Sequence, residues 1–183
     1  MTKRTYKSDV GAIPKIVNNF KPKTLNQRVF HDIISEDQTQ LVLCHGIAGT
    51  GKTYVSIYKA LQDVLRRGTP YDKLIIINPT VDVGNEDKLG FLPGELSSKI
   101  QQYNESTFTI LDKIIGKDKA GKMIQDNKIE IGVLNFLRGV NLENCYVILD
   151  EAQNVSPMQI KTLLTRISEN CKMIIQGDMS QCD

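Results

Sequence analysis

The sequence has few of the features that mark membrane-bound, secreted or zinc-binding proteins. No apolar run approaches the roughly 20 residues that a membrane-spanning helix needs, and the first residues, Met-Thr-Lys-Arg, lack the apolar core of a signal peptide. The four cysteines form no C-x-x-C pair and there are only two histidines, so a zinc site is not expected. We therefore expect reduced thiols, a cytoplasmic location and no association with a membrane.

Strong charge of either sign is also missing. The formal net charge is +2, which gives no support for a protein that binds nucleic acid through bulk charge, although a local basic groove stays possible. Hydrophobic residues make up 40% and charged residues 24%, as in ordinary globular domains, and there are no internal repeats. We expect an irregular lead-in over residues 1–21 and a single domain over residues 22–183.

What the sequence does contain is a glycine-rich turn between a strand and a helix. A short apolar run at 41–44 ends at this turn, and apolar residues at helical spacing follow it. The turn, residues 46–53, reads G-x-x-x-x-G-K-T. A chance glycine-rich turn is the alternative, but the flanking strand and helix are the context of a phosphate-binding loop.

Each part of this loop has a chemical reason. Gly46, Gly49 and Gly51 lack Cβ, so the backbone can take positive φ and bring its N–H groups against phosphate oxygens. The helix that opens near Lys52 adds unsatisfied N–H donors and the positive end of its dipole. Lys52 is expected to reach the β- and γ-phosphates, and the Thr53 hydroxyl to bind Mg²⁺. The expected nucleotide contacts are Gly46, Ile47, Ala48, Gly49, Thr50, Gly51, Lys52, Thr53 and Tyr54.

The rest of the pattern alternates strands with helices. Further strands are expected at 73–77, 129–133, 145–149 and 172–176, and helices at 27–34, 52–65, 95–115 and 157–167. Asn26 is expected to cap the first helix and Ser156, before Pro157, the last. We interpret 81–94 as a loop and 116–122 as a mobile polar turn, with contact to nucleic acid as the less favoured alternative. This order predicts an α/β fold, a parallel sheet with helices on both faces.

Two acidic residues follow the strand at 145–149. Asp150 is expected to hold the Mg²⁺ shell as a Walker B aspartate does, and Glu151 to orient or deprotonate the attacking water. Paired acids can also simply end a strand in solvent, but the phosphate loop favours the catalytic interpretation. Gln153 and Gln181 also follow strands, where a neutral amide can sense a γ-phosphate or fix the lytic water. From the residues alone, ordinary polar loop residues are the favoured alternative for both.

The chemistry also predicts the order of the strands. Gln181 can sense a γ-phosphate only if the strand before it lies close to the strand that enters the phosphate loop. Asp150 must reach the metal, which places its strand on the far side of the one before Gln181. We therefore predict, in order across the sheet, strands 41–44, 172–176, 145–149 and 73–77.

Several motifs together resemble one family. They are V-I-L-D-E-A-Q-N at 147–154, G-D-M-S-Q at 177–181, K-L-G-F-L-P-G at 88–94, F-L-R-G at 136–139 and L-T-R-I at 164–167. Over about residues 22–183 the chain resembles the PhoH family of phosphate-starvation-inducible ATPases, relatives of superfamily-one helicase cores. The resemblance implies a P-loop NTPase with a RecA-like sheet, ATP and Mg²⁺ as cofactors, ATP hydrolysis, and single-stranded RNA or DNA as a partner. One such domain cannot translocate alone, so a homo-oligomer is expected, a ring being one arrangement.

The resemblance also implies roles for single residues. Gln27 matches the glutamine motif that reads the adenine edge in helicase relatives, and Gln181 matches the γ-phosphate-sensing glutamine. With these, the expected catalytic set is Lys52, Glu151 and Gln181. Arg138 and the loop at 79–94 match segments on the nucleic-acid side.

The chain departs from the family pattern at two places. Asn78 stands where family members commonly carry arginine, which removes a cation from the expected strand-binding edge. The sequence ends at Asp183, where relatives continue with a helix and a strand that bear an arginine. On that ground we expect the domain to lack the family's C-terminal end, which counts against efficient hydrolysis unless a neighbouring subunit supplies the arginine. A nucleotide-binding assembly module with negligible turnover and a nucleotide kinase remain alternative functions.

Overall fold

The computed structural model describes residues 16–17, 19–79, 95–132 and 141–181, and the side chains within 95–103 are not described. Every structural statement below concerns these residues. The expectations for Arg138, for the loop after Pro79 and for Asp183 lie outside them.

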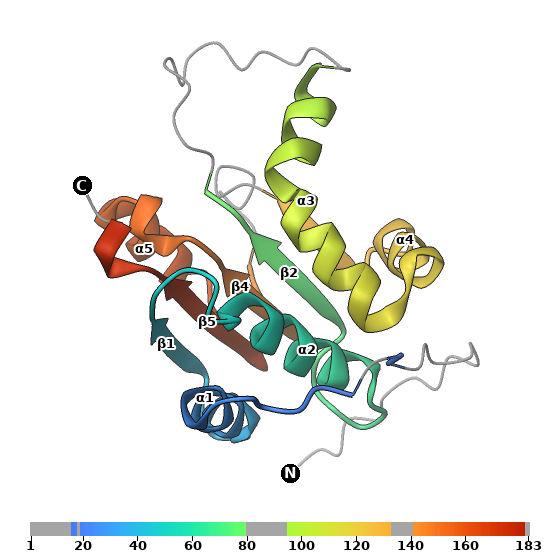
Figure 1. The fold of residues 1–183 in the computed structure, drawn as a ribbon, viewed down its shortest axis with the longest axis horizontal. Helices are drawn as coiled ribbons and strands as arrows, with labels where there is room; N and C mark the ends of the chain where they lie inside the picture. Colours follow the sequence, from blue (N-terminus) through green and yellow to red (C-terminus); the bar gives the residue numbers. More distant parts are fainter. Residues whose placement is uncertain (1–15, 18, 80–94, 133–140, 182–183) are drawn as a thin grey trace.

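Five parallel strands form one sheet (Figure 1). They are β1 (Leu41–His45), β2 (Lys73–Ile77), β3 (Ile129–Gly132), β4 (Cys145–Leu149) and β5 (Cys171–Gly177), in the order β1-β5-β4-β2-β3. β5 lies between β1 and β4, with Leu43 beside Ile175 and Val147 beside Met173. The predicted α/β class and the predicted strand order are therefore confirmed.

Helices cover both faces of the sheet. They are α1 (Leu25–Ser35), α2 (Lys52–Leu65), α3 (Glu95–Ile115), α4 (Lys117–Gln125) and α5 (Pro157–Leu164), with short 3₁₀ turns η3 (Ala152–Asn154) and η4 (Met179–Gln181). The first four helices contribute to one hydrophobic core and α5 packs into the other. Among the described residues, no helix is both long and apolar enough to span a bilayer.

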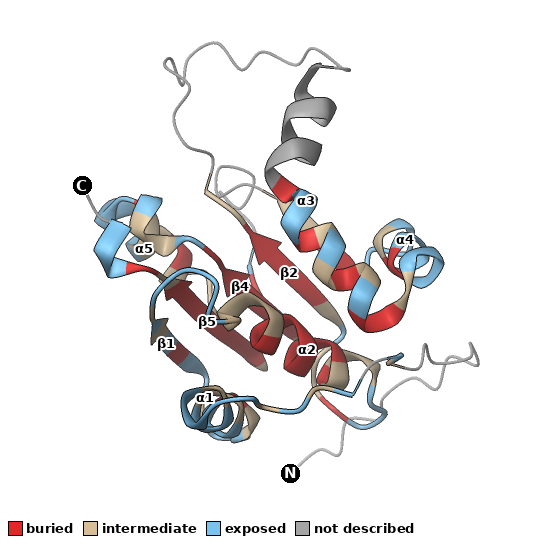
Figure 2. Cartoon of the chain, in the orientation of Figure 1, coloured by how far each residue is buried: buried red, intermediate tan, exposed pale blue. Residues whose placement is uncertain are grey.

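The central strands are apolar on both sides because both sides are buried. Side chains alternate across a strand, so Tyr146 and Ile148 of β4 face the core with α2, whereas Val147 and Leu149 face the core with α5. All of β4 is buried, as the red central strands of Figure 2 show. This double burial explains why the strands read as continuous apolar runs rather than as alternating ones.

Two local predictions were wrong. The cap of α1 is Thr24, whose side chain accepts the N–H of Gln27, and Asn26 lies inside the first turn. Threonine and asparagine both cap helices well, and Thr24 is the cap because its side chain reaches the free N–H of Gln27. Residues 116–122 are not a turn but mostly helix α4, because Ala120 and Met123 share one helical face that is buried against the core.

Other expectations hold. Ser156 caps α5 in a capping box with Gln159. The helix expected at 95–115 is present as α3, and its residues Leu111, Ile114 and Ile115 are fully buried. Phe20, placed in the lead-in by the sequence, packs its ring 5.5 Å from that of Tyr58 in α2. The domain boundary at 21/22 stays a prediction.

Candidate nucleotide-binding site

The phosphate loop lies at the carboxyl edge of the sheet, between the end of β1 and the start of α2 (Figure 1). Its first half is anchored to the exit of β5. The N–H of Gly46 donates to the carbonyl of Gly177 at 3.1 Å, and the N–H of Ala48 donates to Asp178 Oδ2 at 2.8 Å. Lys52 Nζ folds back onto the carbonyl of Gly46 at 2.6 Å. These bonds fix the loop's path before any ligand is bound.

The second half of the loop presents free donors. Gly49 and Gly51 have φ of 78° and 86°, as the sequence predicted, whereas Gly46 does not have positive φ. Among the described residues, the N–H groups of 49–54 donate to no protein acceptor. Free N–H groups at a helix N-terminus form a site for an anion. The arrangement therefore suits phosphate binding by the second half of the loop.

The loop's hydroxyl meets the acidic residue after β4. Thr53 Oγ1 donates to Asp150 Oδ2 at 2.8 Å, although the two residues lie 97 positions apart in the sequence. Asp150 is 7% exposed. The order of the strands brings this hydroxyl and this carboxylate together, as the chemistry predicted.

Gln176 is a site residue that the sequence did not reveal. It is fully buried at the end of β5, and its Nε2 donates to Asp150 Oδ1 at 2.9 Å and to Thr53 Oγ1 at 3.1 Å. Ser56 Oγ donates to its Oε1 at 2.6 Å, which fixes the orientation of the amide. A polar residue directly after three apolar residues, near the end of a strand, was the available signal.

The segment after Asp150 is a compact polar turn. Glu151 has φ of 48°, an uncommon conformation for a residue with a side chain, and it is exposed. Gln153 Nε2 donates to Glu151 Oε2 at 2.7 Å and lies 3.4 Å from Gln181 Oε1. A Cβ on Gly177 would lie 2.6 Å from Gln153 Oε1, so a larger residue would force this amide to shift and disturb its bond to the N–H of Asp178. Gln153 therefore links two of the three predicted catalytic side chains, those of Glu151 and Gln181.

Asp178 lies beside Gln153 and Gln181, and the sequence did not identify it as a site residue. It is 3% exposed, and its Oδ1 accepts the hydroxyl of Ser180 at 2.6 Å. That hydrogen bond is the main cause that holds the pKa of Asp178 below its usual value, and the Ala48 N–H and the Lys52 cation act in the same direction. The carboxylate is thus held in its charged form beside the phosphate loop.

Gln27 contacts the phosphate loop rather than lying apart from it. Its Nε2 donates to the carbonyl of Thr50 at 3.0 Å, and its Oε1 accepts the N–H of Lys23 at 2.8 Å. Each end of the amide makes one bond within the chain, which leaves one N–H of Nε2 and one lone pair of Oε1 for a base edge.

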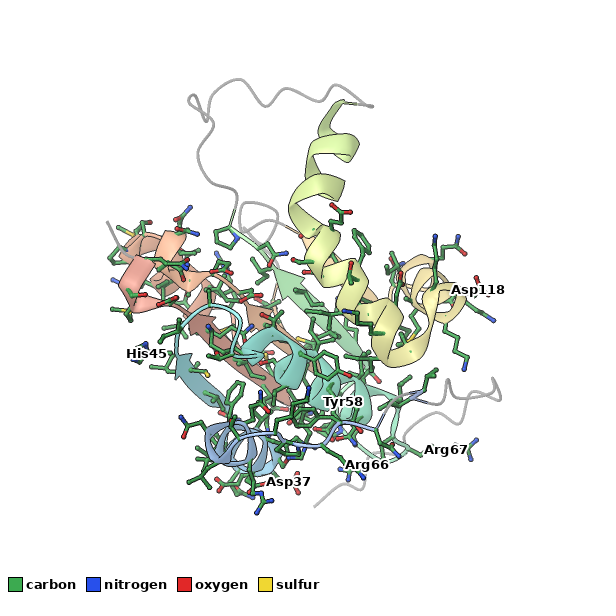
Figure 3. The ribbon with its side chains drawn as sticks, in the orientation of Figure 1. Asp37, His45, Tyr58, Arg66, Arg67 and Asp118 are labelled. Atoms are coloured by element: carbon green, nitrogen blue, oxygen red, sulfur yellow. The ribbon has the colours of Figure 1, made fainter. Side chains whose placement is uncertain are left out.

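Two further sequence features lie away from this cluster. Asn78, at the end of β2, donates to Asn104 and Thr107 of α3, so its side chain belongs to the contact between β2 and α3. The arginines that follow α2, Arg66 and Arg67, lie at the end of that helix opposite to the phosphate loop (Figure 3).

Comparisons with known proteins agree with this geometry. A family model described as PhoH-like protein matches residues 19–183. A PhoH-like protein of Bacillus subtilis (strain 168) is 40% identical over 165 residues, which cover 90% of this chain and 50% of the relative. Protein PhoH of Escherichia coli (strain K12) is 34% identical over 160 residues, covering 86% and 44%. The chain thus spans about half the length of the curated relatives it matches.

Solved structures also share the fold. One of them is the SWI2/SNF2 ATPase core of Sulfolobus solfataricus in complex with dsDNA, with a TM-score of 0.51 and 16% sequence identity. The match covers 93% of this chain and 34% of that one. At this identity the likeness concerns the fold alone. By its match over residues 19–183, the chain belongs to the PhoH family.

Proposed function

We propose that this domain binds ATP with Mg²⁺ and hydrolyses it. The observation that carries the proposal is the contact between Thr53 Oγ1 and Asp150 Oδ2, at 2.8 Å, beside the free N–H groups of residues 49–54. The N–H donors for phosphate thus lie beside the oxygen atoms that can bind a metal ion. Lys52, now bound to the carbonyl of Gly46, is one side-chain reorientation away from the β- and γ-phosphates.

The residues present fit a magnesium ion that shares its shell with phosphate. Mg²⁺ prefers oxygen ligands and is usually held by one or two protein groups together with phosphates and water. In the part of the chain that the structure describes, no group of three or more His, Cys, Asp or Glu gathers as a complete metal cage. Thr53 and Asp150 would be the protein ligands, and Gln176 holds both in place. The bound ion would neutralise charge that develops on the phosphates.

Glu151 is the proposed general base for the attacking water. It is exposed at the carboxyl edge, directly after the proposed metal ligand, and its orientation is set by the bond from Gln153. Gln181 is the proposed sensor of the γ-phosphate and lies at the other end of the same Gln153 amide. A nucleotide kinase has no use for a water-activating glutamate in this place, so hydrolysis is favoured.

We further propose single-stranded RNA or DNA as the partner and a homo-oligomer as the active form. The resemblance to PhoH ATPases and helicase cores supports the first. The second is supported by the same resemblance, because one such domain does not translocate along a strand alone.

Phosphate release from ATP by the purified chain tests these proposals. We expect turnover that requires Mg²⁺, stops with a chelator, and rises when single-stranded RNA or DNA is added. Light scattering during turnover reports the oligomeric state. Tight ATP binding without phosphate release under all of these conditions would instead favour an assembly module with negligible turnover.

A further inference from the structure

The two oxygens of the buried Asp178 carboxylate accept hydrogen bonds from different segments of the chain. Oδ2 accepts the N–H of Ala48 in the phosphate loop at 2.8 Å, and Oδ1 accepts the N–H and the hydroxyl of Ser180 at 3.0 and 2.6 Å. Hydrogen bonds to a charged acceptor are stronger and more directional than neutral ones. One rigid group therefore sets the distance between the loop and the turn that follows β5.

The main chain of Asp178 extends these connections. Its carbonyl accepts the N–H of Gln181 at 3.0 Å, and its N–H donates to Gln153 Oε1 at 3.0 Å. Asp178 thus contacts the phosphate loop, the turn that carries Gln181, and the glutamine that orients Glu151. Ala48 also stands immediately before the free N–H groups of residues 49–54, so its anchor fixes where that row of donors begins.

The strands do not need this carboxylate to stay in register. β1 pairs with β5 from Leu41 to His45, and the N–H of Gly46 already bonds to the carbonyl of Gly177. Beyond Gly46, the described residues join the loop to the end of β5 at two places, through the bond from Ala48 to Asp178 and through the bond from Gln176 to Thr53. The first is the one made by the turn that leads to Gln181. Its loss should therefore loosen the loop relative to Gln181 while the sheet stays intact.

We propose that Asp178 is a positioning residue that couples the phosphate loop to the γ-phosphate-sensing turn at Gln181. This inference rests on the proposed ATPase function. This coupling fixes the position of Gln181 relative to the loop before a nucleotide binds. Gln181 can then contact the γ-phosphate, which ATP has and ADP lacks, so the site distinguishes the two. Without the carboxylate, the loop still binds the phosphates it shares with ADP, but the sensor is no longer in register with the γ-phosphate.

The first test needs no nucleotide. Amide hydrogen exchange at Ala48, followed by NMR in the ligand-free chain, reports the anchor directly. We expect exchange in Asp178→Ala to be about tenfold faster or more, the effect of losing one charge-assisted hydrogen bond. Ser180→Ala is the matched control, because it removes one hydroxyl contact and leaves the bond to Ala48. Asp178→Asn, which keeps an acceptor oxygen, should protect Ala48 to an intermediate degree and serves if the alanine variant does not fold.

The second test compares affinities for ATP and ADP by calorimetry with Mg²⁺. Asp178→Ala should lower the preference for ATP over ADP by about tenfold, whereas Lys119→Ala, at an exposed position on α4, should preserve it. Adding Gln181→Ala to Asp178→Ala should cause little further loss, because coupled residues are not additive. Unchanged exchange at Ala48, or an unchanged ATP-to-ADP preference in a folded Asp178 variant, would overturn the proposal. Failure of the wild-type chain to bind either nucleotide would instead overturn the proposed function, and the exchange result would still test the anchor.

Discussion

In the proposed metal site, the carboxylate of Asp150 accepts hydrogen bonds from three other groups. It accepts from Thr53 Oγ1, from Gln176 Nε2 and from the N–H of Glu151, the last at 3.0 Å. A buried charge is costly unless it is hydrogen-bonded, and three donors offset that cost here. The same donors hold the carboxylate in one orientation, which a metal ligand requires.

Replacement of Lys52 by alanine tests the binding of phosphate. Loss of the ammonium leaves phosphate charge poorly neutralised, so affinity for ATP should fall by about tenfold or more, equivalent to about 1.5–3 kcal/mol. Calorimetry measures the change, and Lys119→Ala, at an exposed position on α4, is the matched control. Equal ATP affinity in the folded Lys52→Ala variant and the wild type would contradict the assignment of the phosphate loop.

Replacement of Glu151 by glutamine separates binding from chemistry. The amide keeps the shape and can still accept from Gln153, but it cannot take a proton from water. Mg²⁺-ATP should bind normally while phosphate release slows by roughly 10²–10⁴-fold, the usual contribution of a general base. Glu143→Gln, at an exposed position, controls for the loss of one negative charge. Turnover at the wild-type rate would exclude Glu151 as the base.

Among the elements, α1 is held at both ends by side chains from other parts of the fold. At its start, Gln27 bonds to the carbonyl of Thr50 in the phosphate loop. At its end, Lys172 Nζ donates to the carbonyls of Ile34 and Glu36, each at 2.7 Å. Lys172 is 2% exposed, and burial lowers its pKa. A lysine on β5 thus closes the last turn of α1, which positions the helix that carries Gln27.

The lysine-rich helix α4 gives a prediction at the same scale. Gly121 lies inside α4, is exposed, and has no atom within 4 Å of an added Cβ. Alanine favours a helix interior over glycine, so Gly121→Ala should raise the free energy of unfolding by about 0.5–1 kcal/mol. Urea denaturation measures the gain. Gly132→Ala, equally free of contacts but at the end of a strand, should give no such gain. No stabilisation by Gly121→Ala would contradict the helix.

For the whole molecule, a buried polar cluster lies beneath α2. Tyr146 donates to Asp63 Oδ2 at 2.9 Å, Lys59 pairs with the same carboxylate at 2.6 Å, and the ring of Tyr71 packs 4.7 Å from that of Tyr146. Burial raises the pKa of Tyr71 to about 12, and the charge of Asp63 adds to the effect. Burial likewise raises the pKa of Tyr146.

This cluster should make stability depend on alkaline pH. Both folded pKa values lie above the value of about 10 for an unfolded tyrosine, so the unfolded chain loses these protons first. The stabilisation is therefore complete below about pH 10 and is lost as the pH rises toward 12. Urea unfolding across this range should show a fall that is shallower in Tyr71→Phe. Tyrosinate absorbance should show the late titration, and an identical fall in both proteins would contradict the prediction.

The sequence by itself determined the features that depend on neighbouring residues or on fixed chemistry. The phosphate loop could be recognised because its glycines, Lys52 and Thr53 are consecutive, and the strands because double burial makes them apolar throughout. The strand order followed from chemistry, since a phosphate sensor and a metal ligand must meet the same loop. The helix at α4 was missed because its apolar stripe is short and lies among lysines.

Only the tertiary structure decided which side chains hold that site together. Asp178 reaches Ala48 across 130 positions of sequence, and Gln176 reaches Thr53 across 123. Neither contact has a local pattern, because each depends on β5 lying between β1 and β4. Adjacent parallel strands bring their ends to one edge, and the polar residues that follow them then become partners however far apart they lie in the chain.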